Sequence, residues 1–278
     1  MKLKYFGTAA AEGFPALYCH CETCERARKA GGRNIRTRSQ ALINDDLLID
    51  FPPDTYMHEL FFGLDLKKIK TCLITHAHTD HLLVSDLCRR TKPDAHFPND
   101  EKEPLFIYAS EKSGREIKNE VELKTIRRDK DALRYCDIEA YKEYKIGDYL
   151  VIPLKAVHAP GLDAFIYIVE EGDKTILYGN DTGYFHEETW SYLEENKIHL
   201  DLVSLDCTLD VGDKYENHMG FDTCIKVRDR LMKTNTDKNT IFIINHFSHN
   251  CNVIYDEFVP IAKKENFLVS YDGFQIEI

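Results

Sequence analysis

The sequence predicts a single α/β sandwich in which β-sheets are covered by helices on their outer faces. The first half of the chain consists mainly of short apolar runs typical of strands, whereas strand-like and helix-like segments alternate after residue 187. No internal repeat, low-complexity tract or Pro/Gly/Ser-rich linker divides the 278 residues. This length is close to the upper limit for one hydrophobic core and allows one large domain or two small ones. Because no linker marks a boundary, residues 1–278 are expected to form one domain.

The first elements are predicted to be short strands joined by polar loops. An apolar strand at 3–7 leads into a Gly- and Cys-bearing loop at about 13–30. Two strands within 41–51 are expected to turn at their Asn-Asp-Asp sequence, because Asn and Asp tolerate turn geometry. The β-branched run at 71–76 ends in a cluster of histidines, and residues 81–90 have a helical pattern.

The middle of the chain is predicted to contain a loop, a strand, a helix and two hairpins. Residues 91–104 are polar and interrupted by proline, which is typical of a loop. A buried strand at 105–110 precedes a charged amphipathic helix at 111–126. The hairpins at 141–159 and 164–181 each turn at a Gly-Asp pair.

The last third of the chain alternates between helices and strands. We expect helices at 188–196, 222–233 and 255–266, and strands at 201–206, 240–246 and 267–278. Asp222 is a plausible N-cap for the helix at 222–233.

Composition limits the function classes. The 36 Lys and Arg against 47 Asp and Glu give a net charge of −11. This balance argues against nucleic-acid and anionic-membrane partners, although 124–134 is locally basic. The longest apolar runs fall well short of the roughly 18 residues of a membrane span, and Gly7 interrupts the start before a signal-peptide core forms. We therefore expect a soluble, cytoplasmic protein.

The residues at 76–81 are the strongest functional signal. They read His-Ala-His-Thr-Asp-His and place three imidazoles and one carboxylate directly after a predicted strand. Neutral imidazole and carboxylate suit zinc, iron or manganese, and ligand type alone does not choose among them. His158, Asp181 and His246 each follow another buried-type strand, so they can converge with the cluster on one edge of the sandwich. The seven predicted metal ligands are His76, His78, Asp80, His81, His158, Asp181 and His246.

This pattern resembles the metallo-β-lactamase superfamily over almost the whole chain. The resemblance implies an αββα sandwich with mixed sheets, helices on the outer faces and two divalent metals at one edge. It implies that His76, His78 and His158 hold one metal, that Asp80, His81 and His246 hold the other, and that Asp181 bridges them. Asp80 is counted as a catalytic residue as well as a ligand. Two such cations can share a hydroxide and lower its pKa, which is hydrolase chemistry.

The cysteines indicate a separate, structural zinc site. Nine cysteines without an export signal do not suggest disulfides, and Cys19, Cys21 and Cys24 crowd into six positions. They supply three of the four ligands of a structural zinc. His249 is the preferred fourth ligand because it lies three residues after His246, and the rivals are Cys251 and His20, which lies between the cysteines.

The cysteine loop and the second C-terminal histidine are similar to PhnP-type phosphodiesterases, which hydrolyse a cyclic ribose phosphodiester. That resemblance implies that His218 lies near the scissile phosphate as a catalytic residue, apart from the metals. A surface histidine at a helix entry is the alternative. Asp206 ends a strand and could orient a ligand histidine or simply cap the strand end. PqqB and tRNase Z are further relatives with the same metal pattern or a cysteine-rich loop.

The expected function is hydrolysis of a small, cyclic phosphodiester by two active-site metals (Mn, Zn or Fe), with one structural Zn. The alternatives are RNA 3′-end processing, thioester or lactone hydrolysis, a PqqB-like oxidation, and a non-catalytic zinc-binding protein. Because related enzymes are often dimers, a homodimer is possible. Arg36 and Arg38 are interpreted as surface residues, His58 as a surface or packing residue, and Phe61 and Phe62 as core.

Overall fold

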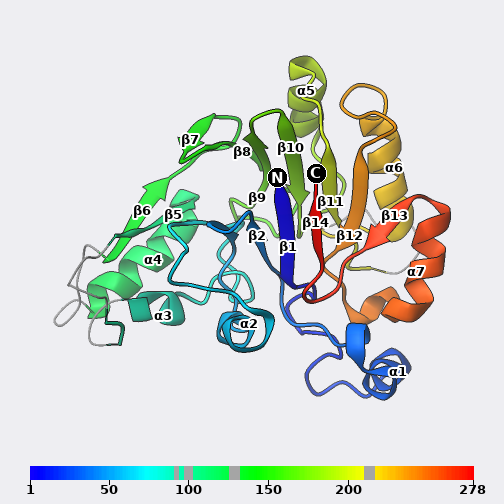
Figure 1. The fold of residues 1–278 in the computed structure, drawn as a ribbon, viewed down its shortest axis with the longest axis horizontal. Coiled ribbons are helices and arrows are strands. Elements are labelled where there is room, and N and C mark those ends of the chain that lie inside the picture. The colour runs from blue at the N-terminus through cyan, green and yellow to red at the C-terminus, as the bar shows by residue number, and fades with distance from the viewer. Residues whose placement is uncertain (91–93, 97–102, 125–131, 210–216) are drawn as a thin grey trace.

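Two β-sheets face each other in the protein (Figure 1). The structure is a computed structural model that describes residues 1–90, 94–96, 103–124, 132–209 and 217–278. Within these ranges each sheet has seven strands, in the orders β14-β1-β2-β3-β4-β5-β6 and β13-β12-β11-β10-β9-β8-β7. The first sheet comprises β1 (Lys2–Gly7), β2 (Gln40–Ile43), β3 (Leu47–Ile49), β4 (Thr71–Leu73), β5 (Leu105–Ala109), β6 (Leu133–Asp137) and β14 (Gln275–Glu277). The second comprises β7 (Tyr144–Ile146), β8 (Tyr149–Lys155), β9 (Phe165–Glu171), β10 (Lys174–Gly179), β11 (Leu202–Asp206), β12 (Ile241–Asn245) and β13 (Phe267–Val269).

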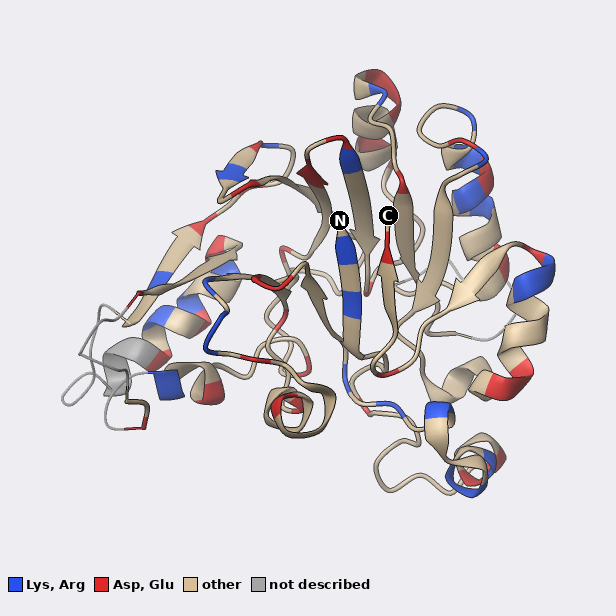
Figure 2. Ribbon diagram, viewed as in Figure 1, with Lys and Arg blue, Asp and Glu red and all other residues tan. Residues whose placement is uncertain are grey.

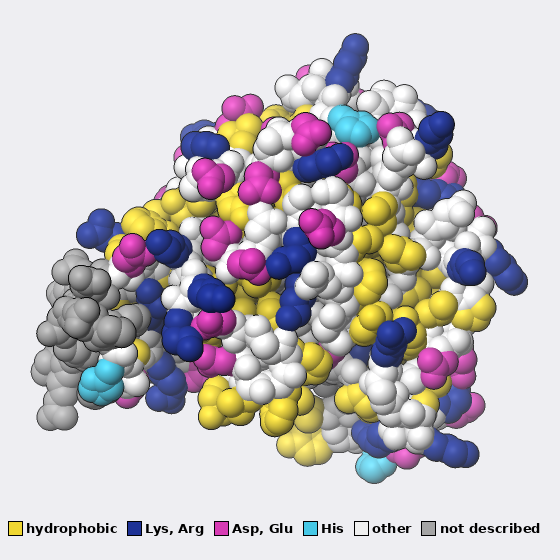
Figure 3. Space-filling view, viewed as in Figure 1, with side chains coloured by type: hydrophobic (Ala, Val, Ile, Leu, Met, Phe, Trp, Pro, Cys, Tyr) yellow, Lys and Arg dark blue, Asp and Glu magenta, His cyan; other side chains and the backbone are white. Residues whose placement is uncertain are grey.

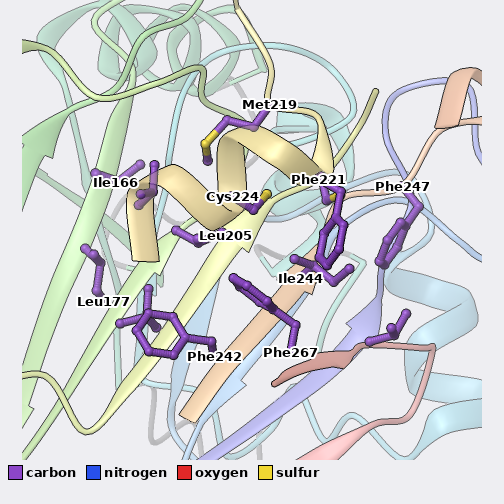
Figure 4. Close-up of a cluster of buried hydrophobic side chains, with 14 of the residues drawn as sticks. Ile166, Leu177, Leu205, Met219, Phe221, Cys224, Phe242, Ile244, Phe247 and Phe267 are labelled. Atoms are coloured by element: carbon purple, nitrogen blue, oxygen red, sulfur yellow. The ribbon is translucent and has the colours of Figure 1, made fainter. Parts of the chain in front are cut away.

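Helices cover the outer face of each sheet. Their bounds are α1 (Glu22–Ala30), α2 (Thr55–Phe62), α3 (Val84–Leu87), α4 (Glu111–Lys124), α5 (Glu187–Asn196), α6 (Phe221–Leu231) and α7 (Tyr255–Lys264). Side chains of α5, α6 and α7 pack with the second sheet in one hydrophobic cluster, part of which is shown in Figure 4. Leu87 of α3 and Ile117 of α4 pack on the first sheet. A third cluster lies between the two sheets, so the layers are α, β, β and α, which confirms the predicted sandwich.

The strand directions bring several strand ends to one edge of the sandwich. β10, β11 and β12 are parallel neighbours, and β8 runs the same way because both it and β10 pair antiparallel with β9. The loop after β4 of the other sheet reaches this edge, where Thr75 O accepts a hydrogen bond of 2.9 Å from Phe165 N. The predicted ligands that follow β4, β8, β10 and β12 therefore meet.

The segment at 267–278 was predicted as one strand, and this is wrong. β13 extends the second sheet and β14 pairs with β1 in the first, because the chain turns at Asp272-Gly273 and crosses between the sheets. The two chain ends consequently lie side by side, and the Met1 ammonium donates to Ile278 O at 2.9 Å (Figure 1).

Other local predictions also need correction. The N-cap of α6 is Gly220 rather than Asp222. The cysteine-bearing loop contains a helix, α1. Arg36 is 3% exposed rather than at the surface, because it packs on the Phe247 ring and donates two hydrogen bonds. Phe61 is 73% exposed rather than in the core. Most of the predicted loop at 91–104, residues 125–126 of the predicted helix and most of the basic run at 124–134 lie outside the described residues.

The surface of the described part is mixed in charge. Lys, Arg, Asp and Glu alternate along the outer helices (Figure 2), with ion pairs one turn apart such as Arg26–Glu22 in α1. Hydrophobic side chains gather over α2 at the lower edge of Figure 3, where Tyr56, Met57, Leu60 and Phe61 are exposed. Among the described helices, none is long and apolar enough to span a membrane.

Candidate metal centre

The seven predicted ligands come together at the shared edge of the two sheets. His76, His78, His158 and Asp181 offer one ligand atom each, and these four atoms lie within 4.8 Å of one another. Asp80, His81, Asp181 and His246 form a second such group. Asp181 belongs to both groups, which is the position expected for a residue that bridges two cations.

The distances in the first group fit convergence on one ion. His78 Nδ1 lies 2.9 Å from His76 Nε2 and 3.1 Å from His158 Nε2. Asp181 Oδ2 lies 3.3 Å from His76 Nε2. Ligand atoms of a tetrahedral zinc site with bonds of about 2.0–2.1 Å are roughly 3.3 Å apart, so the spacing suits a metal of this size.

In the second group, Asp181 Oδ2 lies 3.1 Å from His81 Nε2 and 3.8 Å from His246 Nε2. Asp80 Oδ2 lies 3.2 Å from His81 Nε2. The residues of the second group are buried. Within the described ranges, four ligand-type atoms of the two groups lack a well-formed hydrogen bond: His81 Nε2, His246 Nε2, His158 Nδ1 and Asp181 Oδ1. Because buried polar atoms are normally paired, such a cluster fits the binding of cations.

The electrostatics prepare these side chains to bind metal. Burial lowers the pKa of His76 well below its ordinary value, so its imidazole is neutral and has a lone pair available. Burial opposes ionisation of Asp181, but the surrounding histidines outweigh this effect and hold its pKa well below the usual range. The site therefore combines a neutral imidazole at His76 with a central carboxylate anion. Burial would likewise lower the pKa of His81, but the carboxylates of Asp80 and Asp50 outweigh it and raise that pKa well above its ordinary value.

The outward ring nitrogens are held by residues that are not ligands. His81 Nδ1 lies 2.7 Å from Asp50 Oδ2, and His246 Nδ1 lies 2.7 Å from Thr208 Oγ1. Asp206 Oδ2 lies 3.2 Å from His246 Nδ1, which favours the orienting role over a simple strand-end cap. These contacts direct Nε2 of both histidines into the cluster. Asp50 and Thr208 were not singled out from the sequence, although Asp50 also follows a predicted strand.

Three of the site residues have unusual backbone conformations. Asp50, Asp181 and His246 have φ angles of 67°, 51° and 62°, in the left-handed region that non-glycine residues seldom occupy. Each follows a strand closely, so a sharp turn there aims its side chain along the sheet edge. Strained backbone of this kind is concentrated at functional sites, which supports the assignment of this edge as the active site.

His218 lies beside the cluster. Its Nδ1 is 3.1 Å from Asp181 Oδ1 and 3.2 Å from Asp206 Oδ2, and its side chain is 29% exposed. Burial would lower the pKa of His218, but the bonds to these two carboxylates raise it to about 10. Cations at Asp181 would reduce that effect. His218 also offers a ligand atom within 4.8 Å of those of Asp181, Asp206 and His246.

The three cysteines and His249 form a separate group. His249 Nδ1 lies 3.2 Å from Cys19 Sγ and 3.4 Å from Cys21 Sγ, and Cys24 Sγ completes a set within 4.8 Å. Cys251 is outside this group, because its thiol donates to Val253 O at 3.2 Å. The structure therefore places His249, and not Cys251, with the cysteines.

The start of helix α1 favours a thiolate at Cys21, whereas burial raises the pKa of Cys24 to about 12. Cys21 is the N-cap of α1, and the Cys24 amide bonded to its sulfur at 3.5 Å is the main cause that lowers the pKa of Cys21 to about 6. Glu12 Oε1 lies 3.7 Å from His249 Nε2 and accepts a hydrogen bond from Ser248, which directs His249 Nδ1 toward the sulfurs. Glu12 had no signal in the sequence, since it lies far from His249 along the chain.

The Cys21→Ser variant is expected to lose one zinc per chain and to unfold roughly 5–10 °C lower, because the metal links α1 to the loop after β12. Metal analysis and thermal unfolding measure both effects. Cys136→Ser is the matched control, because Cys136 is a partly buried thiol outside the group. Unchanged stability with a loss of activity alone would contradict a structural role for this site.

A cavity of about 710 Å³ is lined by segments that lead to the metal cluster, although none of the predicted ligands is among its lining residues. Its wall includes Ser110, Asp137 and Phe165, which lie at the ends of β5 and β6 and at the start of β9. Phe165 is bonded to the residue before His76, and Ala156 of the same wall lies two residues before His158. The cavity and the cluster thus share one segment of chain.

An αββα sandwich with histidines and aspartates clustered at one edge defines a class of protein, the metal-dependent hydrolases of the metallo-β-lactamase fold. Residues 46–238 match the family model described as a beta-lactamase superfamily domain, and the chain belongs to this family. The resemblance inferred from the sequence is thereby confirmed. Among curated proteins, none matches this sequence significantly.

Solved structures with this fold match the whole chain at low sequence identity. Zinc-bound PqqB from Methylobacterium extorquens has a TM-score of 0.76 and 17% identity, with 100% of both chains covered. A diphosphatase from the PhnP family has a TM-score of 0.75 and 21% identity, covering 100% of this chain and 97% of that one. Human short-form tRNase Z has a TM-score of 0.67 and 17% identity, covering 100% of this chain and 99% of that one. At these identities the likeness shows a shared fold.

Proposed function

We propose that the protein hydrolyses a small phosphodiester at a dinuclear metal centre. The observation that carries this proposal is His218, a polar side chain that is partly exposed beside the central Asp181 and is not one of the seven predicted ligands. A side chain that donates a proton to the leaving oxygen accelerates the breaking of a P–O bond by roughly 10²–10⁴-fold beyond what the metals supply. The Cys₃His group and the likeness to a PhnP-family diphosphatase support a phosphorus-centred substrate.

In this proposal the residues have the following roles. His76, His78 and His158 would hold one cation and Asp80, His81 and His246 the other, with Asp181 between them. Two divalent ions there supply an activated water and neutralise charge on the attacked phosphate. Asp206 holds Nδ1 of His218, so the opposite ring nitrogen, Nε2, is the one that can donate a proton to the leaving alkoxide. The cavity lined by Ala156 and Phe165 would receive the part of the substrate that does not react.

Elemental analysis paired with hydrolysis of bis-p-nitrophenyl phosphate tests the proposal. We expect about three metals per chain, of which one is tightly held zinc and two are Zn, Mn or Fe, and phosphodiesterase activity that is lost on chelation. Three metals without activity on phosphodiesters would contradict the substrate class and direct the search to thioesters and lactones. One zinc or none would contradict the ligand assignments themselves.

Two relatives define specific alternatives. The likeness to PqqB points to an oxidation, which oxygen consumption by the iron-loaded protein would reveal. The likeness to tRNase Z points to RNA 3′-end processing, which cleavage of a 3′-extended transfer RNA would reveal. The net charge of −11 weighs against RNA as the main substrate. A protein that binds zinc without turnover of any of these substrates would be a binding protein.

A further inference from the structure

A chain of hydrogen bonds runs from Gln40 to Asp272 through residues outside the ligand set. His58 is fully buried, and its Nδ1 lies 2.6 Å from Gln40 Oε1. Its other nitrogen, Nε2, lies 2.8 Å from Thr37 Oγ1. Thr37 Oγ1 lies 2.6 Å from Asp272 Oδ2. Gln40, His58, Thr37 and Asp272 are called the proton chain below.

The direction of the first bond is determined by Gln40. Its amide nitrogen donates to the carbonyl oxygen of Asp50 at 2.9 Å and to Thr55 Oγ1 at 3.0 Å. Since the Asp50 carbonyl can only accept, the amide cannot be turned around. Gln40 Oε1 therefore faces His58, and His58 Nδ1 must carry a proton and donate it.

The remaining bonds require one more proton than the usual ionisation states provide. A threonine hydroxyl has a single hydrogen, yet Thr37 Oγ1 contacts both His58 Nε2 and Asp272 Oδ2. If the hydroxyl donates to a neutral His58, the carboxyl of Asp272 must be protonated and donate to Thr37. If it donates to an ionised Asp272, His58 must be a cation. In both cases the pair holds one additional proton.

Burial favours the neutral form of both partners, and at Asp272 it outweighs the donors of Thr37 and Thr8 and the charge of Arg36, which lower its pKa. Burial lowers the pKa of His58 to about 4, and removal from water raises the pKa of Asp272 to about 6. The charged groups facing the pair are Arg36, bonded to Thr8 beside Asp272, and Asp54, which is paired with Arg38. Lys4 packs on Phe6 above His58.

The two ends of the proton chain connect to the loops that carry His81 and His246. At one end Gln40 holds the Asp50 backbone, and the Asp50 carboxylate bonds His81 Nδ1. At the other end Asp272 Oδ1 accepts from Thr8 Oγ1 at 2.7 Å. The Thr8 carbonyl accepts from the amide of Phe247, the residue after His246. His81 and His246 are predicted ligands of the same metal.

We propose that His58, Thr37 and Asp272 share one proton and act as positioning residues for the metal site formed by Asp80, His81 and His246. When the proton is lost, the Thr37 hydroxyl can satisfy only one neighbour, and the contact to the other becomes repulsive. The loops carrying the two histidines then lose their common support, so that site binds its metal more weakly. The inference rests on the ligand assignments above but not on the substrate.

The linkage to pH has a definite sign. A carboxyl whose pKa is raised on folding contributes stability below its unfolded value, and this contribution is lost as pH rises through the folded value. For Asp272 the loss occurs between about pH 4 and pH 6. The proton chain is therefore intact in mildly acidic solution and broken at neutral pH.

Nitrogen-15 NMR of the histidines and carbon-13 NMR of the aspartate carboxyls, both on the zinc-loaded wild-type protein, test the proton directly. At pH 5.5 we expect neutral His58 with its hydrogen on Nδ1 and a protonated Asp272 carboxyl. A His58 that carries its hydrogen only on Nε2, or an ionised Asp272 beside a neutral His58, would overturn the proposal. This measurement needs no variant and no substrate, so failure of the phosphodiesterase proposal would not affect it.

The Thr37→Val variant tests the effect on the metal site. Chelator competition should show about tenfold weaker binding of the more weakly held active-site zinc than in wild type at pH 5.5. This ratio should shrink to within about twofold at pH 7.5, where the wild type has also lost the proton. Thr189→Val is the matched control, since Thr189 is a buried threonine bonded to Lys155 O outside the chain. An equal ratio at both pH values would contradict the proposed coupling.

Discussion

The Asp181→Asn variant is expected to lose both active-site metals at concentrations where the wild type is saturated. Asp181 supplies a carboxylate to both ligand groups, and its oxygens lie 3.1–3.3 Å from His76, His81 and His158. Removing one partner from a buried set of charges costs about 3–5 kcal/mol, which corresponds to roughly 10²–10⁴ in metal affinity. Hydrolytic activity should fall at least in proportion to the metal lost.

Elemental analysis and chelator competition measure this change. The zinc held by Cys19, Cys21, Cys24 and His249 should remain, because that group does not include Asp181. Asp201→Asn is a matched control, since Asp201 is half-buried and paired with Lys174 away from the cluster. Retention of two metals at wild-type affinity in Asp181→Asn would remove Asp181 from its bridging role.

The His218→Ala variant is expected to lower kcat by roughly 10²–10⁴ while leaving the metal content unchanged. The reason is that the polar contacts of His218 with the cluster run from Nδ1 to the carboxylates of Asp181 and Asp206, which leaves its other nitrogen free of them. Its ring also packs against those of His158 and His246. The variant should also lose the limb of the pH–rate profile that reports a general acid. Steady-state kinetics with a chromogenic phosphodiester measures both effects.

Metal analysis of the same variant distinguishes the two possible roles of His218. Loss of a metal would make His218 a ligand, as its place in a group with Asp181, Asp206 and His246 allows. Wild-type turnover would remove it from the mechanism. His199→Ala is the control, because His199 is an exposed histidine outside all four ligand groups.

The local spacing of residues was sufficient to predict the metal ligands but not the residues that orient them. His76 to His81 occupy six positions after a strand, and His158, Asp181 and His246 each follow a buried-type run, so each carries a signal in its immediate neighbourhood. Asp50 and Glu12 act on histidines 31 and 237 residues away along the chain. Their roles depend on which loops meet, and a single sequence holds no local pattern for that.

The burial of Arg36 likewise could not be predicted from its neighbours in the sequence. An arginine near the start of a strand is normally solvated, and most of the residues at 34–40 are polar. In the fold it is buried because Phe247 and Ser270, more than 200 residues later, provide a ring face and a carbonyl oxygen. The segment at 267–278 is divided between the two sheets for a similar reason. Each sheet had an edge strand that could still pair, and β13 and β14 each occupy one of these positions.

By itself, the sequence determined the α/β class, the seven-residue metal pattern and the crowding of Cys19, Cys21 and Cys24. These follow from hydrophobic periodicity and from ligand chemistry, both of which act over a few neighbouring residues. Only the tertiary structure decided that His249 rather than Cys251 joins the cysteines, that Asp50 and Thr208 orient His81 and His246, and that His58 lies in a chain ending at Asp272. Those outcomes depend on contacts between distant segments, which exist only once the two sheets have packed together.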